Sequence, residues 1–192
     1  MNMRYFVTVV LFIASMTGAK AKNNISVDYT EESELVSVIA HLAKVPGYIW
    51  PEEQAGVIDY FHQVDSTFAP YSNHPIMAFV ADSLVKQGFG YHVPVAMALR
   101  LKLKNGKLHY NTDLEPDFNH YYRGITPRHE KKLIALLEDF YKKAHFHSFF
   151  KKNQPLYNAC KQAMQQQLVD KIDLDWYKSF FGPINNISFH IY

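Results

Sequence analysis

Cysteine is almost absent from this 192-residue chain, which contains only Cys160. An intramolecular disulfide is therefore impossible, and packing must hold the fold together. Leu156, Tyr157, Cys160 and Met164 recur at the spacing of one apolar helix face. We therefore expect Cys160 to be a small buried side chain rather than a catalytic thiol, which needs an activating base. The chain also lacks Cys-x-x-Cys, Gly-x-Ser-x-Gly and a phosphate-binding glycine loop, so the sequence gives no sign of the chemistries that use these motifs.

An excess of charge of one sign is also missing, because 20 Lys and Arg face 18 Asp and Glu. A short basic start, an uncharged apolar run and the small-x-small sequence Ala19-Lys20-Ala21 predict a signal peptide over residues 1–21. Its removal takes away two of the 20 cations, Arg4 and Lys20, and leaves 18 basic against 18 acidic residues. A neutral chain lacks the basic footprint of nucleic-acid-binding proteins, so we expect no nucleic-acid partner.

Long hydrophobic runs are confined to that first segment, and no cysteine directly follows the predicted cleavage site. No other segment reaches the roughly 20 apolar residues that a membrane-spanning helix needs. We therefore expect an exported protein, periplasmic or extracellular, without a lipid anchor and without membrane contact after signal removal. Residues 22–192 are enough for a single domain with its own hydrophobic core.

Apolar residues at helical spacing predict about six helices in residues 22–192. Capping residues and helix breakers mark the ends of these helices. The predicted starts are Asp28 or Thr30, Pro51, Asn73, Thr126, Pro155 and Asp173. The predicted ends are Pro46-Gly47, Pro70, Gly88, Val169 and Gly182, and the apolar face of the Thr126 helix includes residues from Leu133 to Ala144. This pattern is typical of a mainly helical α+β protein.

The strongest strand signal is a β-hairpin near residues 97–110. Leucines alternate with cations from Leu99 to Lys104, and Asn105-Gly106 then provides a type I′ turn. Residues 187–192 also alternate apolar with polar side chains, which predicts a strand at that end of the sequence. A lone hairpin is only marginally stable, so we expect this strand to join it in a small three-stranded antiparallel sheet.

Histidines provide the only candidate metal ligands, and none forms a complete set. His145 and His147 would share one face of a strand, but a helix would point them about 200° apart, and we expect structural roles at a helix end. His129-Glu130 begins like the zinc-peptidase sequence His-Glu-x-x-His, but Leu133 stands in place of the second histidine. His74 follows the predicted cap Asn73, which favours a turn residue over a ligand.

The segment 111–125 is aromatic and polar without a clear period. Glu115 and Asp117 are the one pair of acids there that we consider for glycoside hydrolysis, although loop acids are usually solvated. Phe118, Tyr121 and Tyr122 are candidate ligand-binding residues, since exposed rings stack on a sugar or peptide. The alternative is that these rings cover an edge of the core.

Six segments, taken in order, resemble one known family. They read ELVSVIAHLAKVPGY, VIDYF, YSNHPIMAF, VPVAMALRLKLKNGKL, LEDFYKKAHFHSFFKKNQPLY and DWYKSFFG. This order resembles the N-terminal half of secreted bacterial proteins of unknown function that are similar to gluzincin-type zinc metallopeptidases. The resemblance covers most of residues 22–192, and its motifs concern packing and turns. It implies that the His-Glu-x-x-His helix lies beyond the last strand, so it gives this chain no catalytic residue and no cofactor, and zinc only to a longer family member.

Two functional hypotheses follow. The first is the non-catalytic N-terminal portion of an exported zinc-metallopeptidase-like protein, either as part of a longer chain or as a stand-alone remnant without peptidase activity. The second is an extracellular or periplasmic binding module for a glycan or peptide. An enzyme with a spatially assembled site of its own is a third and weaker alternative.

Overall fold

The computed structural model describes residues 25–49, 58–110, 124–173, 176, 179–180, 182 and 189–191. These contain six α-helices, namely α1 Glu31–Leu42, α2 Ile58–Phe68, α3 Pro75–Ala78, α4 Val93–Leu99, α5 Pro127–Lys143 and α6 Phe146–Gln167. Shorter helical segments are η1 Ala69–Tyr71, the π-helical η2 Phe79–Leu84, η3 Val85–Gln87 and η5 Val169–Lys171. The strands are β1 Ile25–Val27, β2 Leu101–Lys104, β3 Lys107–Tyr110 and β4 Phe189–Ile191. The predicted mainly helical α+β class is confirmed.

Helix α1 lies at the centre of the fold, and α3, α4, α5, α6 and β2 all pack against it. Its start is fixed locally, because the Thr30 side chain accepts a hydrogen bond from the Ser33 N–H at 3.1 Å, and the Ser33 hydroxyl reciprocates. Its buried residues then recur at helical spacing, and they are Leu35, Val36, Val38, Ile39 and Ala40. The predicted apolar helix is thus the element around which the others gather.

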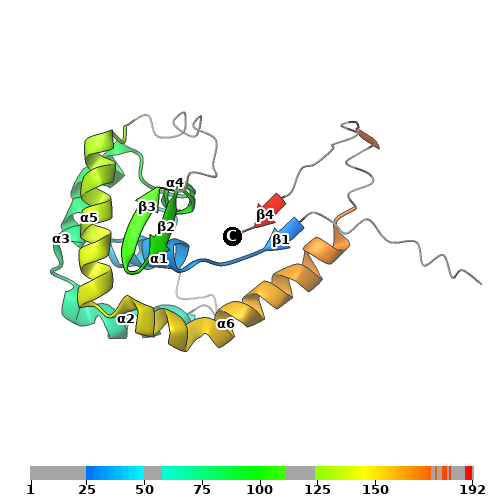
Figure 1. Ribbon diagram of the computed structural model, residues 1–192, viewed down its shortest axis with the longest axis horizontal. Coiled ribbons are helices and arrows are strands. Elements are labelled where there is room, and N and C mark those ends of the chain that lie inside the picture. Colours follow the sequence, from blue (N-terminus) through cyan, green and yellow to red (C-terminus); the bar gives the residue numbers. More distant parts are fainter. Residues whose placement is uncertain are drawn as a thin grey trace, which may run out of the picture.

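Phenylalanines join α2, α5 and α6 beneath α1. The Phe68 ring centroid lies 5.5 Å from that of Phe140 and 4.9 Å from that of Phe149. Figure 1 shows α5 along one side of the molecule and α6 leaving its lower end at a steep angle. Aromatic rings at these separations bury large apolar areas, so this corner is a main part of the core.

Residues 75–87 form one continuous helical run of α3, η2 and η3. Its cap is His74 rather than the predicted Asn73, because the His74 ring Nδ1 accepts from the Ile76 N–H at 3.2 Å. The run ends at Gly88, whose φ of 88° lies in the left-handed region that glycine enters without strain. The predicted end of this helix is therefore confirmed.

The hairpin of β2 and β3 is confirmed in residues 101–110, with Leu101 opposite Tyr110 and Lys104 opposite Lys107. Asn105 and Gly106 have φ of 53° and 71°, as a type I′ turn requires. The prediction began the hairpin too early, because residues 97–99 belong to α4. The reason is that Met97 and Ala98 are buried in a helical turn against the core, and this burial outweighs the local strand pattern.

The partner predicted for the last strand is wrong. Strand β4 pairs with β1, in parallel and with Ile25 opposite Phe189, so the two sheets have two strands each. β1 packs along α6 and offers its backbone to β4, as the 2.8 Å hydrogen bond from the Asp28 N–H to the Ile191 carbonyl shows. The backbone N–H and carbonyl groups of β1, which precedes α1, need hydrogen-bonding partners just as those at the edge of the hairpin do. Figure 1 shows this pair well apart from the hairpin.

Helix α6 continues through Pro155, which was predicted to begin a new helix. Pro155 lies on the exposed side, where water can bond to the carbonyl group that loses its helical donor. Downstream, the Trp176 N–H donates to Asp173 Oδ1 at 3.0 Å, which confirms the predicted Asp173 cap. The predicted signal peptide and the predicted start of α2 at Pro51 lie outside the described residues. No helix in the described part of the chain combines the length and apolar character of a membrane span.

Candidate functional site

The two histidines singled out from the sequence have different positions at the start of α6. His145 is the residue before the first turn, exposed and with a left-handed φ of 50°. His147 lies inside the helix, and its Nδ1 is 2.9 Å from Glu31 Oε1 on α1. Within the described ranges, no group of three or more His, Cys, Asp or Glu side chains is arranged to hold a metal ion.

The partial zinc-peptidase sequence at the start of α5 makes structural contacts. His129 Nδ1 accepts from the Thr126 N–H at 3.3 Å, which completes the cap of this helix. Glu130 accepts from Arg100 at 2.7 Å and from the Tyr110 hydroxyl at 3.2 Å. Its carboxylate therefore ties α5 to α4 and the hairpin.

The remaining predicted residues fall into three groups. His74 Nε2 lies 3.0 Å from Asp139 Oδ2, so this histidine links two helical segments as well as capping one. Cys160 is exposed, which corrects the prediction of a buried side chain, because α6 extends past the body that covers its first turns. The candidate rings and acids all lie outside the described residues, namely Phe118, Tyr121, Tyr122, Glu115 and Asp117.

The structure assembles a group of side chains that the sequence did not single out, which we call the acid–tyrosine cluster: Glu34, Tyr60 and Tyr157. The Tyr60 hydroxyl on α2 donates to Glu34 Oε1 on α1 and lies 2.9 Å from the Tyr157 hydroxyl on α6. Burial raises the pKa of Glu34, although the hydrogen bonds from both tyrosines oppose this. Burial, reinforced by the Glu34 charge, raises the pKa of both tyrosines. The cluster thus places a buried carboxyl group and two tyrosine hydroxyls at a junction of three helices.

A neighbouring carboxylate extends this network to α5. The Tyr141 hydroxyl donates to Glu31 Oε1 at 2.9 Å, and the same oxygen contacts His147. Acids in the first turn of α1 therefore connect this helix to α2, α5 and α6. Acids at this position also complement the positive end of the helix dipole. Their partners lie 26 to 116 residues further along the chain, and no local pattern could pair them.

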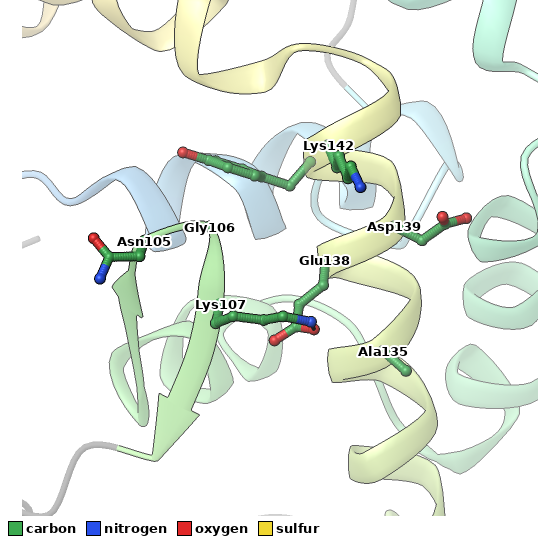
Figure 2. Close-up of a pocket in the computed structure, with 8 residues that line it drawn as sticks. Asn105, Gly106, Lys107, Ala135, Glu138, Asp139 and Lys142 are labelled. Atoms are coloured by element: carbon green, nitrogen blue, oxygen red, sulfur yellow. Dashed lines mark hydrogen bonds and ion pairs between the residues drawn. The ribbon is translucent and has the colours of Figure 1, made fainter.

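An open hollow of about 490 Å³ lies between the hairpin turn and α5 (Figure 2). Its lining residues are Asn105, Gly106, Lys107, Ala135, Glu138, Asp139, Tyr141 and Lys142. Figure 2 shows Lys107 and Glu138 pointing toward one another, with Lys107 Nζ 2.9 Å from Glu138 Oε2. Burial would raise the pKa of Glu138, but hydrogen bonds from Lys107 and the Leu108 N–H bring it below its usual range.

No family model, curated protein or solved structure matches this chain. The structure itself therefore offers two places to consider for function. The acid–tyrosine cluster is internal and joins helices. The hollow between the hairpin and α5 is open and carries an amide, two ammonium groups, carboxylates and a tyrosine ring, which together can bind a polar ligand.

Proposed function

We propose that this chain is the non-catalytic N-terminal portion of an exported zinc-metallopeptidase-like protein of unknown substrate. The observation that supports the proposal is where the resembling segments lie. ELVSVIAHLAKVPGY forms α1 and the turn after it, and LEDFYKKAHFHSFFKKNQPLY forms the corner of α5 and α6. The buried Leu35, Phe140 and Phe146 belong to these two segments. The part of the chain that resembles the family is thus a scaffold with its own core.

In this proposal the chain positions other groups and does no chemistry. The acid–tyrosine cluster and Glu31 fix α1 against three helices, so the scaffold is rigid where these elements meet. Zinc and its ligands belong to a longer form of the protein. None of the described residues is assigned a catalytic role.

The intact mass of the protein exported by the native cell tests this proposal. We expect a mass larger than that of residues 22–192, about one zinc ion per molecule of the longer form, and peptide hydrolysis that a chelator abolishes. The matched control is a chain of residues 22–192 produced alone, which we expect to bind no zinc and to hydrolyse no peptide. A native mass equal to residues 22–192, or a longer form without zinc, would contradict the proposal.

The hollow favours a second candidate, a periplasmic or extracellular binding module for a glycan or peptide. Asn105 offers both a donor and an acceptor, Lys142 offers an exposed ammonium group, and Tyr141 offers an aromatic edge. Such mixed linings fix the orientation of polar ligands. The rings of the segment 111–125 are separate candidates for the same role.

Binding of glycan and peptide libraries to immobilised protein, followed by calorimetry on any hit, tests this candidate. Loss of one charge-assisted hydrogen bond through Lys142→Ala should weaken binding about tenfold. Lys151→Ala is the control, because Lys151 is an exposed lysine on α6 that does not line the hollow. Equal affinities of the two variants would rule out the hollow as the binding site.

A further inference from the structure

Helix α6 is longer than the body against which it packs. Its first turns bury a set of residues at helical spacing, namely Phe146, Phe149, Phe150, Asn153 and Tyr157. The same face then continues into Cys160 and Met164, which are exposed. Figure 1 shows this half of α6 running away from α5.

Four residues at successive i, i+4 positions form what we call the α6 stripe: Leu156, Cys160, Met164 and Leu168. Leu156, Met164 and Leu168 are 41%, 40% and 45% exposed. At 100° per residue, Leu156, Cys160 and Met164 span only about 80° of the helix circumference. A row of apolar side chains at this exposure is typical of a surface that packs against another helix.

Strand β1 packs on α6, and the two residues that follow it contact α6 beside the stripe rather than over it. Lys161 Nζ lies 2.5 Å from Asp28 Oδ1, and the Tyr29 hydroxyl donates to Asn158 Oδ1 at 3.0 Å. Lys161 is about 100° around the helix from Cys160, and Asn158 is further round still. In the described part of the chain, therefore, the contacts of Asp28 and Tyr29 leave the stripe exposed.

The charges at the two ends of the stripe indicate what covers it. Lys151 and Lys152 lie about one turn before Leu156, whereas Asp170 and Lys171 follow Leu168, and Gln165 Nε2 donates to Asp170 Oδ1 at 2.7 Å. An antiparallel pair of α6 helices centred on Cys160 would place Lys152 of each copy near Leu168 and Asp170 of the other. A parallel pair would instead bring Lys151 and Lys152 of both copies together at one end. The antiparallel orientation therefore separates the two lysine pairs and places each of them near the Asp170 carboxylate of the other copy.

We propose that the α6 stripe is a homodimer interface, in which two copies of this chain pack α6 against α6 in antiparallel orientation around a two-fold axis near Cys160. Leu156 of one copy then packs against Met164 of the other. Helices in such contacts lie 8–10 Å apart, which suits side chains of this size. The interface is separate from the hollow and does not depend on the proposed function.

Sedimentation equilibrium of the mature chain over a concentration series tests the interface. We expect a monomer–dimer equilibrium in which Met164→Lys raises the Kd about tenfold or more, since it places two cations at the contact. Gln162→Lys is the matched control, because it adds the same charge to an exposed position on the opposite side of α6 and should leave the Kd unchanged. A monomer at all concentrations up to about 1 mM, or equal effects of the two variants, would overturn the proposal.

Two further measurements test the antiparallel register. A short bismaleimide should cross-link Cys160 of one copy to Cys160 of the other, and Met164→Lys should abolish the cross-linked dimer. Lys152→Glu should weaken the dimer, and adding Asp170→Lys to it should restore the affinity. A dimer that persists without Cys160 cross-linking, or a double variant weaker than both single ones, would overturn this register.

Discussion

The acid–tyrosine cluster leads to a quantitative prediction for Tyr60→Phe. This change removes only the hydroxyl that donates to Glu34 and contacts Tyr157 at 2.9 Å. The ring remains, so its packing against Phe61 and Phe149, with centroids 5.8 and 6.1 Å away, is kept. The expected loss is therefore that of a hydrogen bond to a buried acid, about 1.5–3 kcal/mol of unfolding free energy.

Thermal and urea unfolding provide the assay. For a chain of this size each kcal/mol lowers the melting temperature by about 2–4 °C, so Tyr60→Phe should lower it by about 3–12 °C. Tyr29→Phe is the control, because its hydroxyl also donates a hydrogen bond, to Asn158, but at an exposed site where a change of at most about 0.5 kcal/mol is expected. Equal melting temperatures for the two variants would refute the role of the cluster.

The pKa of Glu34 gives the same cluster a pH signature. Because burial raises this pKa in the folded protein, the group contributes stability that is fully present below its unfolded value of about 4.3. That stability is lost as the pH rises through the raised folded value. Glu34→Gln does not titrate, so the wild type should lose stability relative to this variant as the pH increases from 4 to 8. Parallel stability curves from urea unfolding would show that Glu34 is not buried as described.

Three other changes test the fold. Gly106→Val should lower the unfolding free energy by about 1–2 kcal/mol, because a β-branched residue is strained at the left-handed φ of this position. Steric overlap adds nothing to this cost, since an added Cβ would lie 3.7 Å from Tyr141. Gly106→Asn should have a smaller effect, and equal melting temperatures of the Val and Asn variants would contradict the type I′ turn. Phe68→Ala should lower the unfolding free energy measured with urea by about 3–5 kcal/mol, because this ring is buried in the core. The control Ile49→Ala should lower it by only about 0.5 kcal/mol, because Ile49 is exposed. Glu138→Gln should lower stability at pH 7 but much less near pH 3, because a lowered pKa contributes stability that is lost as the pH falls through it. A deficit that is the same at both pH values would contradict the ion pair.

The features that the sequence predicted correctly depend on residues close together in the chain. The Thr30 and Thr126 caps, the Asn105-Gly106 turn and the Gly88 end each involve atoms within about four residues. At such separations the backbone geometry and side-chain chemistry of the residues themselves almost determine the local structure, so the sequence alone predicts it.

The features that it missed depend on distant parts of the chain. Which strand β4 would join was decided by where α6 brings β1, and this is a tertiary property. Cys160 looked buried because the apolar spacing of α6 continues beyond the last helix that covers it. The cluster of Glu34, Tyr60 and Tyr157 carries no local signal, since single tyrosines and acids are common on helix surfaces.

The pairing of β1 with β4 also determines the order in which the fold can form. Ile25 and its partner Phe189 are 164 positions apart, and closing a flexible loop of that length costs about 4.5 kcal/mol of chain entropy. Once α6 has docked beside β1 through Lys161 and Asp28, only 28 residues separate Lys161 from Phe189, and the cost falls to about 3 kcal/mol. Docking of α6 should therefore precede strand pairing. During synthesis β1 must wait for residues 189–191 before its sheet can close, so among the described elements this sheet should be the last to acquire protection from hydrogen exchange.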